Sequence, residues 1–394
     1  MKESIFNYRF EYENQKYIFN TNNNGLIQIN NDIFTEEERE YLRVNRFWVD
    51  DNEDEIALLE REINHNIQKR QKKLELTIAL TNYCNFSCVY CYQNKNEKLM
   101  TTEVANMIIE KIDRILNDNK FEGINIHYFG GEPLLNIPVL IYLDENIKKI
   151  TDKIGIVYKA FLTTNGSMLS KELLQKVKFS SIQLTFDGLE KTHDRLRVSD
   201  HFHFKEEIEL IENIMNFSQA KVLLRTNICK ENKDEIIALH KYIFEKFGNE
   251  RIEINPNRTI KYHQDDSFEM LSVQEYAEVA YQIKLLWSEQ KGKFELPVPR
   301  STPCKFPYGN AYAISPEGYC TFCSGSMDQE KKYFFGVDIE NKKMFSVRKE
   351  CKKCNILPLC LGGCIIQYNL RAGACTYEKY ELKNILISYI KHIS

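Results

Sequence analysis

From residue 74 onward, apolar and polar positions alternate between stretches typical of strands and stretches typical of helices. The helical stretches lie near residues 102–117, 138–150, 169–178, 204–217 and 232–247. The candidate strands are Leu74–Leu80, Gly123–Phe129, Val157–Thr163, Ser181–Phe186, Lys221–Thr226 and Arg251–Asn255. These strand–helix repeats predict an α/β fold in which a parallel sheet is covered by helices. When such a sheet curves into a barrel, the active site forms at the C-terminal ends of the strands.

The segment 1–73 follows a different pattern, with short strands and then two helices. Glu36–Phe47 and Asp54–Gln68 are the expected helices, and the second carries apolar residues at helical spacing. The expected strands are Tyr8–Glu13, Lys16–Thr21 and Gly25–Asn30, with an Asn-rich turn before the third. This segment is therefore expected to be a small α+β unit.

Composition and charge limit the kinds of partner that the protein is expected to bind. A chain of 394 residues usually forms two or three domains, and 43% hydrophobic residues are enough for a core. A formal net charge of −3 gives no case for a basic, nucleic-acid-binding face. The N-terminus, MKESIFNYRFEYENQ, lacks an apolar signal core, and no segment approaches about 18 uninterrupted apolar residues. We expect a cytoplasmic protein with no nucleic-acid or membrane partner.

The twelve cysteines are unevenly placed. Three lie at 84–91, Cys229 stands alone, and eight fall between Cys304 and Cys375. Cysteines of a reducing compartment rarely form disulfides, and clusters at separated places indicate metal sites. Cys229 is expected to be a small buried hydrophobic residue.

The first cysteine group has the spacing CxxxCxxC, formed by Cys84, Cys88 and Cys91. Such a run can bring three thiolates to one iron–sulfur cube and leave its fourth iron without a protein ligand. An iron of that kind can bind a small molecule, so the spacing indicates chemistry. The alternatives are unrelated cysteines or zinc, although zinc usually takes four ligands and no His or fourth Cys adjoins this run.

The run CNFSCVYCY resembles the signature of the radical S-adenosylmethionine (SAM) superfamily. The resemblance implies a partial (β/α)6 TIM-like barrel and a [4Fe–4S] cluster whose fourth iron is chelated by SAM. One-electron reduction, by a flavodoxin- or ferredoxin-type donor, would cleave SAM to a 5′-deoxyadenosyl radical that takes hydrogen from the substrate. The cofactors would carry this chemistry while the protein binds, orients and excludes water.

The same resemblance implies a set of SAM contacts at the strand ends. The aromatic residue before the last cysteine would lie beside the adenine, and the GGEP run would hold the amino group. A TNG turn, a hydroxyl residue and an arginine twelve residues later would complete the site, because a guanidinium can bind both oxygens of a carboxylate. The residues are Tyr90, Gly130, Gly131, Glu132, Asn165, Thr185 and Arg197. The alternative for each is an ordinary turn, surface pair or packing contact.

Two further polar residues lie within candidate strands. Arg225 must face the barrel mouth or find a partner, which makes it another candidate for the site. His127 could be a base or a ligand, but an interior histidine with a satisfied hydrogen bond is the preferred interpretation. The sequence singles out no general base.

The C-terminal cysteines resemble the SPASM extension, whose pattern is C…Gx4C…Cx2Cx5Cx3C…C. The pattern falls on Cys304, Cys323, Cys351, Cys354, Cys360, Cys364 and Cys375. The resemblance implies two auxiliary [4Fe–4S] clusters and so three clusters in all. Two structural zinc ions are the alternative.

Carried over by position, Cys351, Cys354, Cys360 and Cys375 would hold the distal auxiliary cluster. The cluster nearer the barrel would take Cys304, Cys323 and Cys364, one ligand short. Cys320 is extra to the pattern and could be the eighth ligand. In that case neither auxiliary cluster has a vacant iron, which favours electron transfer; a free Cys320 would favour binding of a substrate atom instead.

The layout of the segment 1–73 resembles the winged-helix-like peptide-recognition domain that precedes many peptide-maturing enzymes. That domain binds a leader peptide as an added strand at a sheet edge. An ordinary N-terminal cap is the alternative. The expected domains are therefore 1–73 for peptide recognition, 74–300 for the radical SAM barrel and 301–394 for the SPASM domain.

Together these resemblances imply an oxidoreductase that modifies a ribosomally made precursor peptide through a carbon–carbon or thioether crosslink. An anaerobic sulfatase-maturating enzyme, which forms formylglycine, is one alternative, although the long segment before Cys84 counts against it. A zinc-dependent binding protein is the alternative from another class.

Overall fold

The structure is a computed structural model that describes residues 1–29, 34–118, 120–248, 251–261, 268–308, 310–321, 323–326, 333–335, 344–364 and 375–393. By packing, the chain forms two compact units. The barrel unit comprises Arg70–Leu271 and Gly309–Lys342. The terminal unit comprises Met1–Lys69, Ser272–Tyr308 and Lys343–Ser394, so it combines segments from all three domains expected from the sequence.

The described strands of the barrel unit form one nine-stranded sheet in the order β11-β10-β9-β8-β7-β6-β12-β13-β14. The first six in chain order pair in parallel with their neighbours, and β12 continues the sheet in parallel beside β6. The short β13 and β14 are antiparallel additions at the edge. Their bounds are β6 Lys73–Ala79, β7 Gly123–Phe129, β8 Val157–Thr163, β9 Phe179–Thr185, β10 Lys221–Ile228, β11 Ile252–Arg258, β12 Ala311–Ile314, β13 Tyr319–Thr321 and β14 Tyr333–Phe334.

This topology confirms the predicted partial barrel. Strands β6 to β11 lie in chain order, and β11 ends the sheet at one edge in the described part of the chain. The observed bounds of β7 and β8 are those predicted from the sequence. The sequence did not predict the β12–β14 extension, because strands of two to four residues carry too few positions to show alternation.

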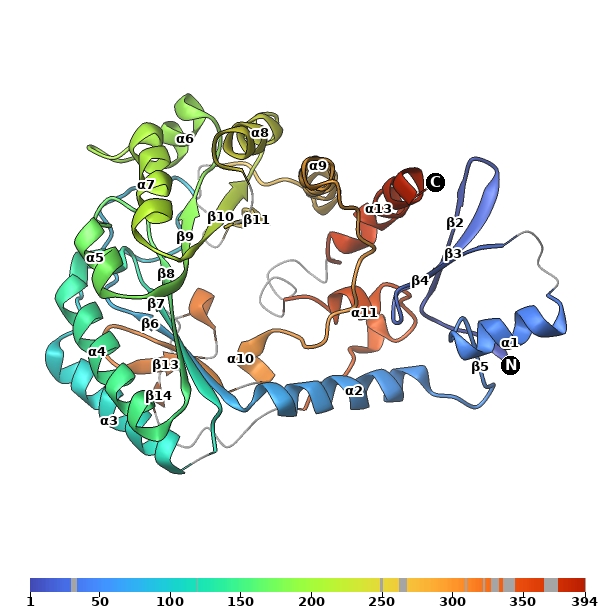
Figure 1. Ribbon diagram of the computed structural model, residues 1–394, viewed down its shortest axis with the longest axis horizontal. Coiled ribbons are helices and arrows are strands. Elements are labelled where there is room, and N and C mark those ends of the chain that lie inside the picture. The colour runs from blue at the N-terminus through green and yellow to red at the C-terminus, as the bar shows by residue number, and fades with distance from the viewer. Residues whose placement is uncertain are drawn as a thin grey trace. The chain divides into compact units, whose positions relative to one another are not determined.

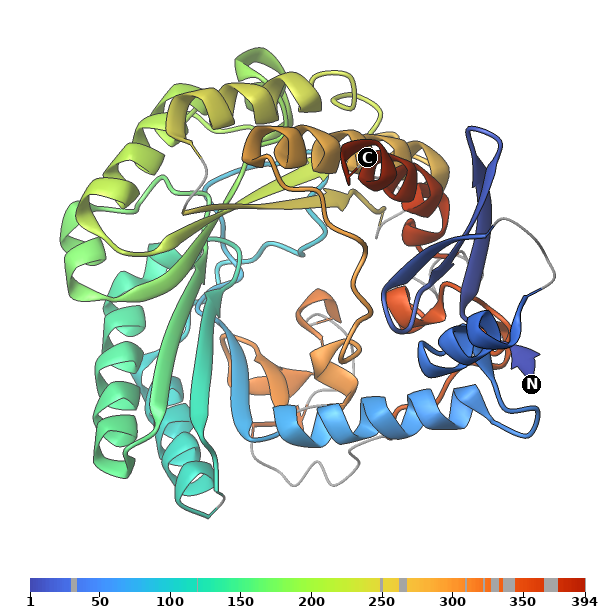
Figure 2. The same ribbon diagram turned by 45° about the vertical axis from the view of Figure 1, so that its right-hand side comes forward.

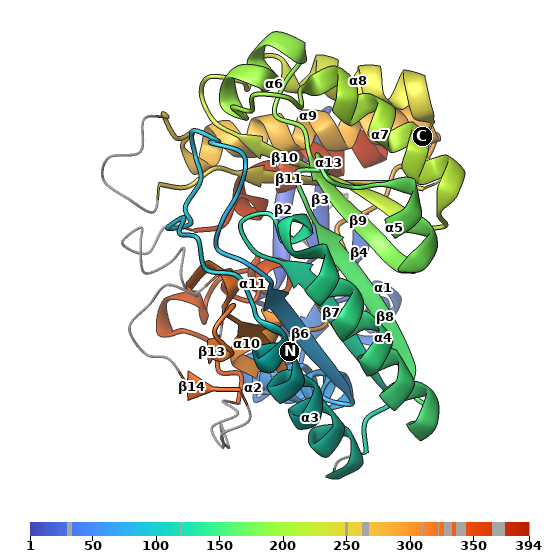
Figure 3. The ribbon, with the colours of Figure 1, turned by 90° about the vertical axis from the view of Figure 1, so that its left-hand side faces the viewer.

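Helices cover the outside of this sheet, as Figures 1 and 3 show for α3 and α4. Their packing follows from apolar residues at helical spacing; in α3 the buried positions are Ala105, Ile108, Ile112 and Leu116. Gly155 ends α4 because it adopts a left-handed φ of 80°. The bounds are α3 Thr102–Asp118, α4 Ile137–Ile154, α5 Lys171–Lys176, α6 Glu190–Leu196, α7 Phe204–Phe217 and α8 Ile236–Phe247.

The terminal unit begins with a three-stranded antiparallel sheet in the order β2-β3-β4 and a two-stranded pair of β1 and β5. Helix α13 packs against α9, and the two lie side by side in Figure 2. The bounds are β1 Lys2–Glu3, β2 Asn7–Tyr12, β3 Gln15–Asn20, β4 Gly25–Ile29, α1 Glu36–Val44, β5 Trp48–Val49, α2 Glu55–Arg70, α9 Val273–Lys291, α10 Lys305–Tyr308, α11 Leu357–Cys360 and α13 Glu378–Ile393.

The N-terminal elements share a core with C-terminal residues of the same unit. Asn64 of α2 both donates to and accepts from the backbone of Phe345, at 2.9 and 2.8 Å. One apolar cluster contains Phe6, Leu59, Ile63, Ile67, Phe345, Val347, Leu357 and Leu361. A second contains Phe10, Phe19, Ile356, Leu359, Leu382, Leu386 and Ile390. The segment Met1–Lys69 therefore depends on the C-terminal segment to bury its apolar faces.

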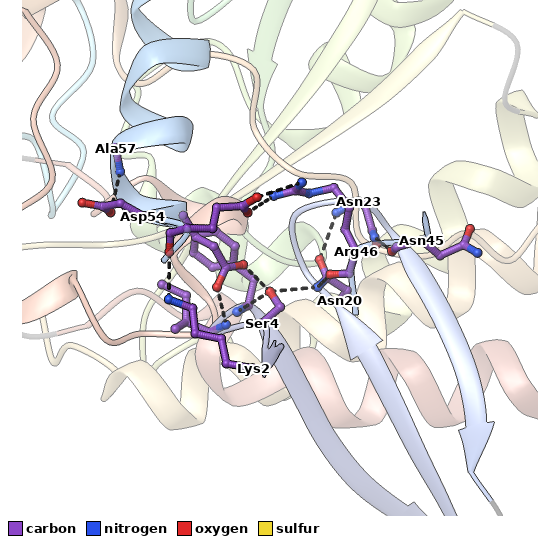
Figure 4. Close-up of polar contacts among 12 residues, drawn as sticks. Lys2, Ser4, Asn20, Asn23, Asn45, Arg46, Asp54 and Ala57 are labelled. Carbon is purple, nitrogen blue, oxygen red and sulfur yellow. Dashed lines mark hydrogen bonds and ion pairs between the residues drawn. The ribbon is translucent and has the colours of Figure 1, made fainter. Parts of the chain in front are cut away.

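A polar network joins the first strands to the start of α2 (Figure 4). The Ser4 hydroxyl donates to Glu55 at 2.5 Å and accepts from Asn20 Nδ2 at 3.3 Å. Asn20 also donates to the carbonyl of Arg46, and Asn23 donates to the carbonyl of Asn45. These contacts fix the turn before β4 against the end of α1.

Among the described residues, no helix combines the length and apolar character needed to cross a membrane.

Candidate active site

The cysteine loop, residues 81–91, follows β6 at its C-terminal end. Its three thiols are not in disulfides and are partly buried. Burial raises the pKa of Cys88 to about 11, the Arg197 guanidinium lowers it, and the charges of Cys91 and Cys84 raise it again. Among the described residues, no group of three His, Cys, Asp or Glu is assembled in metal-binding geometry.

The loop carries donors suited to thiolate ligands. The Phe86 N–H donates to Cys84 Sγ at 3.4 Å, and Asn165 Nδ2 lies 3.9 Å from the same sulfur. Donors to ligating sulfurs are a usual feature of iron–sulfur sites. The residues present therefore fit a three-thiolate cluster site.

The glycines of the GGE turn allow close packing against the cysteine loop. Gly131 N–H donates to the Thr81 carbonyl at 2.8 Å, and Glu132 N–H donates to the Tyr83 carbonyl at 2.9 Å. A Cβ on Gly130 would lie 2.4 Å from Thr81 O, and one on Gly131 would lie 2.2 Å from Tyr83 O. The close approach that requires glycine here is to the protein's own backbone, just before Cys84.

Glu132 is fully buried and joins the turn after β7 to the turn after β8. Its carboxylate accepts hydrogen bonds from Leu134 N–H at 2.9 Å, Thr164 Oγ1 at 2.7 Å and Asn165 N–H at 2.6 Å. Burial raises its pKa, and these donors oppose the rise. A carboxylate offers about four acceptor positions, so one remains for a further donor. Contact with a SAM amino group stays a prediction.

Asn165 connects the turn after β8 to the cysteine loop. Its Nδ2 donates to Asn85 Oδ1 at 2.8 Å, and its Oδ1 accepts from the N–H and hydroxyl of Ser167 at 3.0 and 2.7 Å. Asn165 therefore lies beside Cys84, and its contact with SAM stays a prediction.

Arg197 follows α6 and lies between two residues that are hydrogen-bonded to the cysteine loop. Ser87 N–H donates to the Val198 carbonyl at 2.8 Å, and Val89 N–H donates to the Leu196 carbonyl at 3.0 Å. The Arg197 guanidinium is 5.4 Å from the ring centroid of Phe86. Arg197 is 6% exposed, and its Nε has no hydrogen-bond partner in the described part of the chain. A buried guanidinium with a spare donor fits a carboxylate ligand.

Tyr90 is fixed by Asp187, which follows β9. The Tyr90 hydroxyl donates to Asp187 Oδ2, and the Tyr90 ring meets Phe268 edge-on at a centroid distance of 6.5 Å. Burial raises the pKa of Tyr90, and the nearby Asp187 charge adds to the rise. The sequence did not single out Asp187; the only signal was its place in the strand-end run Thr185-Phe186-Asp187-Gly188.

The remaining polar candidates of the barrel unit have protein partners. Thr185 ends β9 beside Arg225 of β10, and Arg225 Nε donates to Asn227 Oδ1 at 2.8 Å. His127 Nε2 is 2.8 Å from Thr163 Oγ1, which agrees with an interior histidine that has a hydrogen-bond partner. Cys229 is fully buried in the barrel core, as predicted.

The cysteines of the predicted distal auxiliary set all belong to the terminal unit. Cys354 N–H donates to the Cys351 carbonyl at 3.0 Å. Burial raises the pKa of Cys360 to about 11, and the charges of Glu378 and Cys354 add to the rise. Cys375 is exposed.

The other predicted auxiliary cysteines are distributed over both units. Cys304 and Cys364 are exposed residues of the terminal unit, and Cys323 is a partly buried residue of the barrel unit. Cys320 is fully buried in β13, where it pairs with Ile314 and Tyr333. Burial raises its pKa to about 11.

Comparison with known protein families finds a match within the barrel unit. Residues 78–243 match the Radical SAM superfamily. The match contains the cysteine loop, the GGE turn, Asn165, Thr185 and Arg197. Apart from Thr185, the other parts are held against the cysteine loop by the contacts described above.

Two relatives cover different shares of the chain. An uncharacterized protein of Methanocaldococcus jannaschii is 34% identical over 119 residues, which are 29% of this chain and 39% of that protein. The radical SAM cyclopropyl synthase TigE of Paramaledivibacter caminithermalis is 24% identical over 373 residues, which are 83% of this chain and 76% of TigE. This chain thus spans well under half of the first relative and three quarters of the second.

Solved structures with the same fold include two that hold peptides. anSMEcpe, solved with bound AdoMet and the Cp18Cys peptide, has a TM-score of 0.63 at 18% identity and covers 82% of this chain and 100% of its own. Streptococcus suis SuiB, bound to the precursor peptide SuiA, has a TM-score of 0.55 at 14% identity and covers 94% of this chain and 97% of its own. Both likenesses confirm the fold.

Proposed function

Because residues 78–243 form a radical SAM domain, we propose that this radical SAM enzyme modifies a ribosomally made precursor peptide in the cytoplasm. The observation that carries the chemistry is the cysteine loop, hydrogen-bonded to the GGE turn on one side and to the residues around Arg197 on the other. The peptide substrate is supported by the similarity to TigE over most of the chain and by peptide-bound proteins of the same fold.

The cofactor-holding residues are proposed to divide as follows. Cys84, Cys88 and Cys91 hold a [4Fe–4S] cluster, and Arg197 binds the SAM carboxylate. Glu132 accepts from the SAM amino group with its remaining lone pair, while Tyr90, Asn165 and Thr185 line the nucleotide. When bound, this cofactor pair supplies a carbon radical that can take hydrogen from an unactivated C–H bond.

The reaction is proposed to be a carbon–carbon or thioether crosslink within the peptide. Joining two atoms of one peptide removes two hydrogens. One would be removed as a hydrogen atom by the 5′-deoxyadenosyl radical, which forms when one electron from an external flavodoxin- or ferredoxin-type donor cleaves SAM to that radical and methionine. The second leaves as a proton and an electron, and the electron would pass to two auxiliary clusters held by the C-terminal cysteines.

The leader of the peptide is proposed to add a strand beside β4. The described residues leave β4 as an edge strand, with backbone groups available for pairing. A hollow of about 290 Å³ lies along it, lined by residues of β4 and of α1. Two exposed apolar side chains of α1, Tyr41 and Val44, stand at this hollow with 54% and 65% of their surface exposed. A strand with apolar side chains would cover them.

Co-expression with a short peptide encoded beside this gene tests the function. The expected product is a peptide lighter by two hydrogens in mass spectrometry, formed only when the three loop cysteines are intact. A peptide that is bound but stays unmodified by the reconstituted, reduced enzyme would contradict the crosslinking proposal.

A further inference from the structure

The carboxylate of Asp187 connects three segments of the barrel unit that are far apart in sequence. Oδ2 accepts from the Tyr90 hydroxyl in the cysteine loop, and Oδ1 accepts from Asn227 N–H in β10 at 2.7 Å. The Asp187 carbonyl accepts from Asn232 Nδ2 at 2.8 Å, and the same amide donates to the Asn227 carbonyl at 2.9 Å. Each side-chain oxygen of Asp187 thus has a specific donor.

Asp187 is fully buried, so this arrangement is costly to disturb. A buried carboxylate is tolerated when it is hydrogen-bonded and near opposite charge. Burial raises the pKa of Asp187, and the Arg197 guanidinium supplies the opposite charge that counteracts this rise. Removing the donor to one Asp187 oxygen leaves that oxygen without a hydrogen bond, and because Asp187 is fully buried no water replaces the donor.

Tyr90 links Asp187 to the cysteine loop. It precedes Cys91, its ring packs against the cluster of Leu196, Cys229 and Phe268, and its hydroxyl points to Asp187. Both ends of the ring are therefore fixed. The position of Cys91 follows, because one peptide unit links it to Tyr90.

We propose that Asp187 is a positioning residue that holds Tyr90 and thereby orders the cysteine loop for cluster and SAM binding. The SAM part of this inference rests on the proposed function, whereas the ordering of the loop does not. Loss of the Tyr90–Asp187 hydrogen bond should raise the equilibrium constant for opening of the cysteine loop about tenfold. This ratio corresponds to about 1.4 kcal/mol for one hydrogen bond.

The first test uses amide hydrogen exchange on the full, metal-free chain. Tyr90→Phe removes only the hydroxyl, and the amides of Val89 and Cys91 should exchange about tenfold faster. Tyr142→Phe is the matched control, because it removes a tyrosine hydrogen bond of 2.6 Å to Asn106, between α4 and α3. Unchanged exchange in Tyr90→Phe, or equal acceleration in both variants, would overturn the proposal.

Substitutions at Asp187 distinguish the roles of its two carboxylate oxygens. Asp187→Asn keeps an acceptor for Asn227 N–H and places an amide donor opposite the Tyr90 oxygen, so it should loosen the loop less than Asp187→Ala does. Equal effects of both substitutions would contradict a positioning role that depends on hydrogen bonding.

The second test measures equilibrium SAM binding by reconstituted enzyme. Tyr90→Phe should raise the Kd for SAM about tenfold, and Tyr142→Phe should leave it unchanged. Equal SAM affinity of wild type and Tyr90→Phe would overturn the cofactor part of the proposal. Failure of the wild type itself to bind SAM would refute the proposed function, while the exchange result on the metal-free chain would still decide the loop-ordering role.

Discussion

Val89 in the cysteine loop donates its backbone N–H to the carbonyl of Leu196, 3.0 Å away, directly before Arg197. The same pairing continues from Ser87 to Val198, so Arg197 lies between two residues that are hydrogen-bonded to the loop. The proposed cluster ligands and the proposed carboxylate-binding guanidinium are therefore fixed to one another by backbone contacts. The two groups can be tested separately.

Replacing Cys84, Cys88 and Cys91 together with Ala should abolish formation of 5′-deoxyadenosine from SAM. Without three thiolates the iron cube has no protein ligands in the barrel. Chromatography of the reduced reaction measures the product. Iron bound by the C-terminal cysteines should remain, and Cys229→Ala, which changes a core cysteine, should keep the activity. Any SAM cleavage by the triple variant would show that the cluster lies elsewhere.

Arg197→Lys should weaken SAM binding by at least about tenfold. An ammonium cannot reproduce the two-pronged contact of a guanidinium with a carboxylate, and its burial costs more because water hydrates it more strongly. Equilibrium dialysis with SAM measures the change. Arg195→Lys, at an exposed position two residues away, is the control and should bind normally. Equal affinities would exclude Arg197 from the SAM site.

Gly131→Ala should prevent assembly of the cysteine loop. The added methyl would lie 2.2 Å from the Tyr83 carbonyl oxygen, so the backbone before Cys84 must move. The measurement is iron content and SAM cleavage after anaerobic reconstitution. Gly155→Ala is the control, because its Cβ meets nothing within 4 Å and only its positive φ is strained. That variant should lose stability of about 1–2 kcal/mol and keep its iron.

Val44→Glu should weaken binding of the peptide leader about tenfold or more. The new carboxylate would replace an exposed apolar side chain at the hollow beside β4, where the leader strand would pack, while the exposed position lets the protein fold. Fluorescence anisotropy of a labelled leader measures the affinity, and Leu58→Glu on α2 is the control, since Leu58 is also partly exposed at 36%. Deletion of residues 1–70 would be a poorer test, because it removes Leu59, Ile63 and Ile67 from a shared core.

Stability should fall in acid through His240. This residue is fully buried, and burial lowers its pKa from 6.5 to about 4. The folded protein therefore keeps it neutral, whereas the unfolded chain binds a proton once the pH drops below 6.5. The free energy of unfolding should lose up to about 3 kcal/mol between pH 6.5 and pH 4 from this residue.

Urea unfolding above pH 6.5 and near pH 4 measures that loss. His240→Gln should show a smaller acid loss than wild type, because it has no titrating ring. His201→Gln, at an exposed position, should behave as wild type. An unchanged pH slope in His240→Gln would mean that the ring is protonated in the folded state.

Much of the barrel could be predicted because its signals are local. The bounds of β7, β8 and α7 match the expected ranges, since each carries a full period of buried positions. Helix α6 was missed, because seven residues that begin directly after a strand-end turn show no clear helical period. The packing of the N-terminal segment against the C-terminal segment could not be predicted, since Asn64 meets Phe345 only after folding.

The sequence by itself determined the ligand types and their spacing. Three thiolates within eight residues, and the alternation of strands with helices, are properties of short stretches that need no distant partner. Only the tertiary structure decided how the side chains are used. Glu132 and the adjacent glycines hold the cysteine loop through contacts about fifty residues away in sequence or less, and Asp187 reaches Tyr90 across 97 positions. Such pairings depend on which strand ends meet at one edge of the sheet, and no local pattern encodes that.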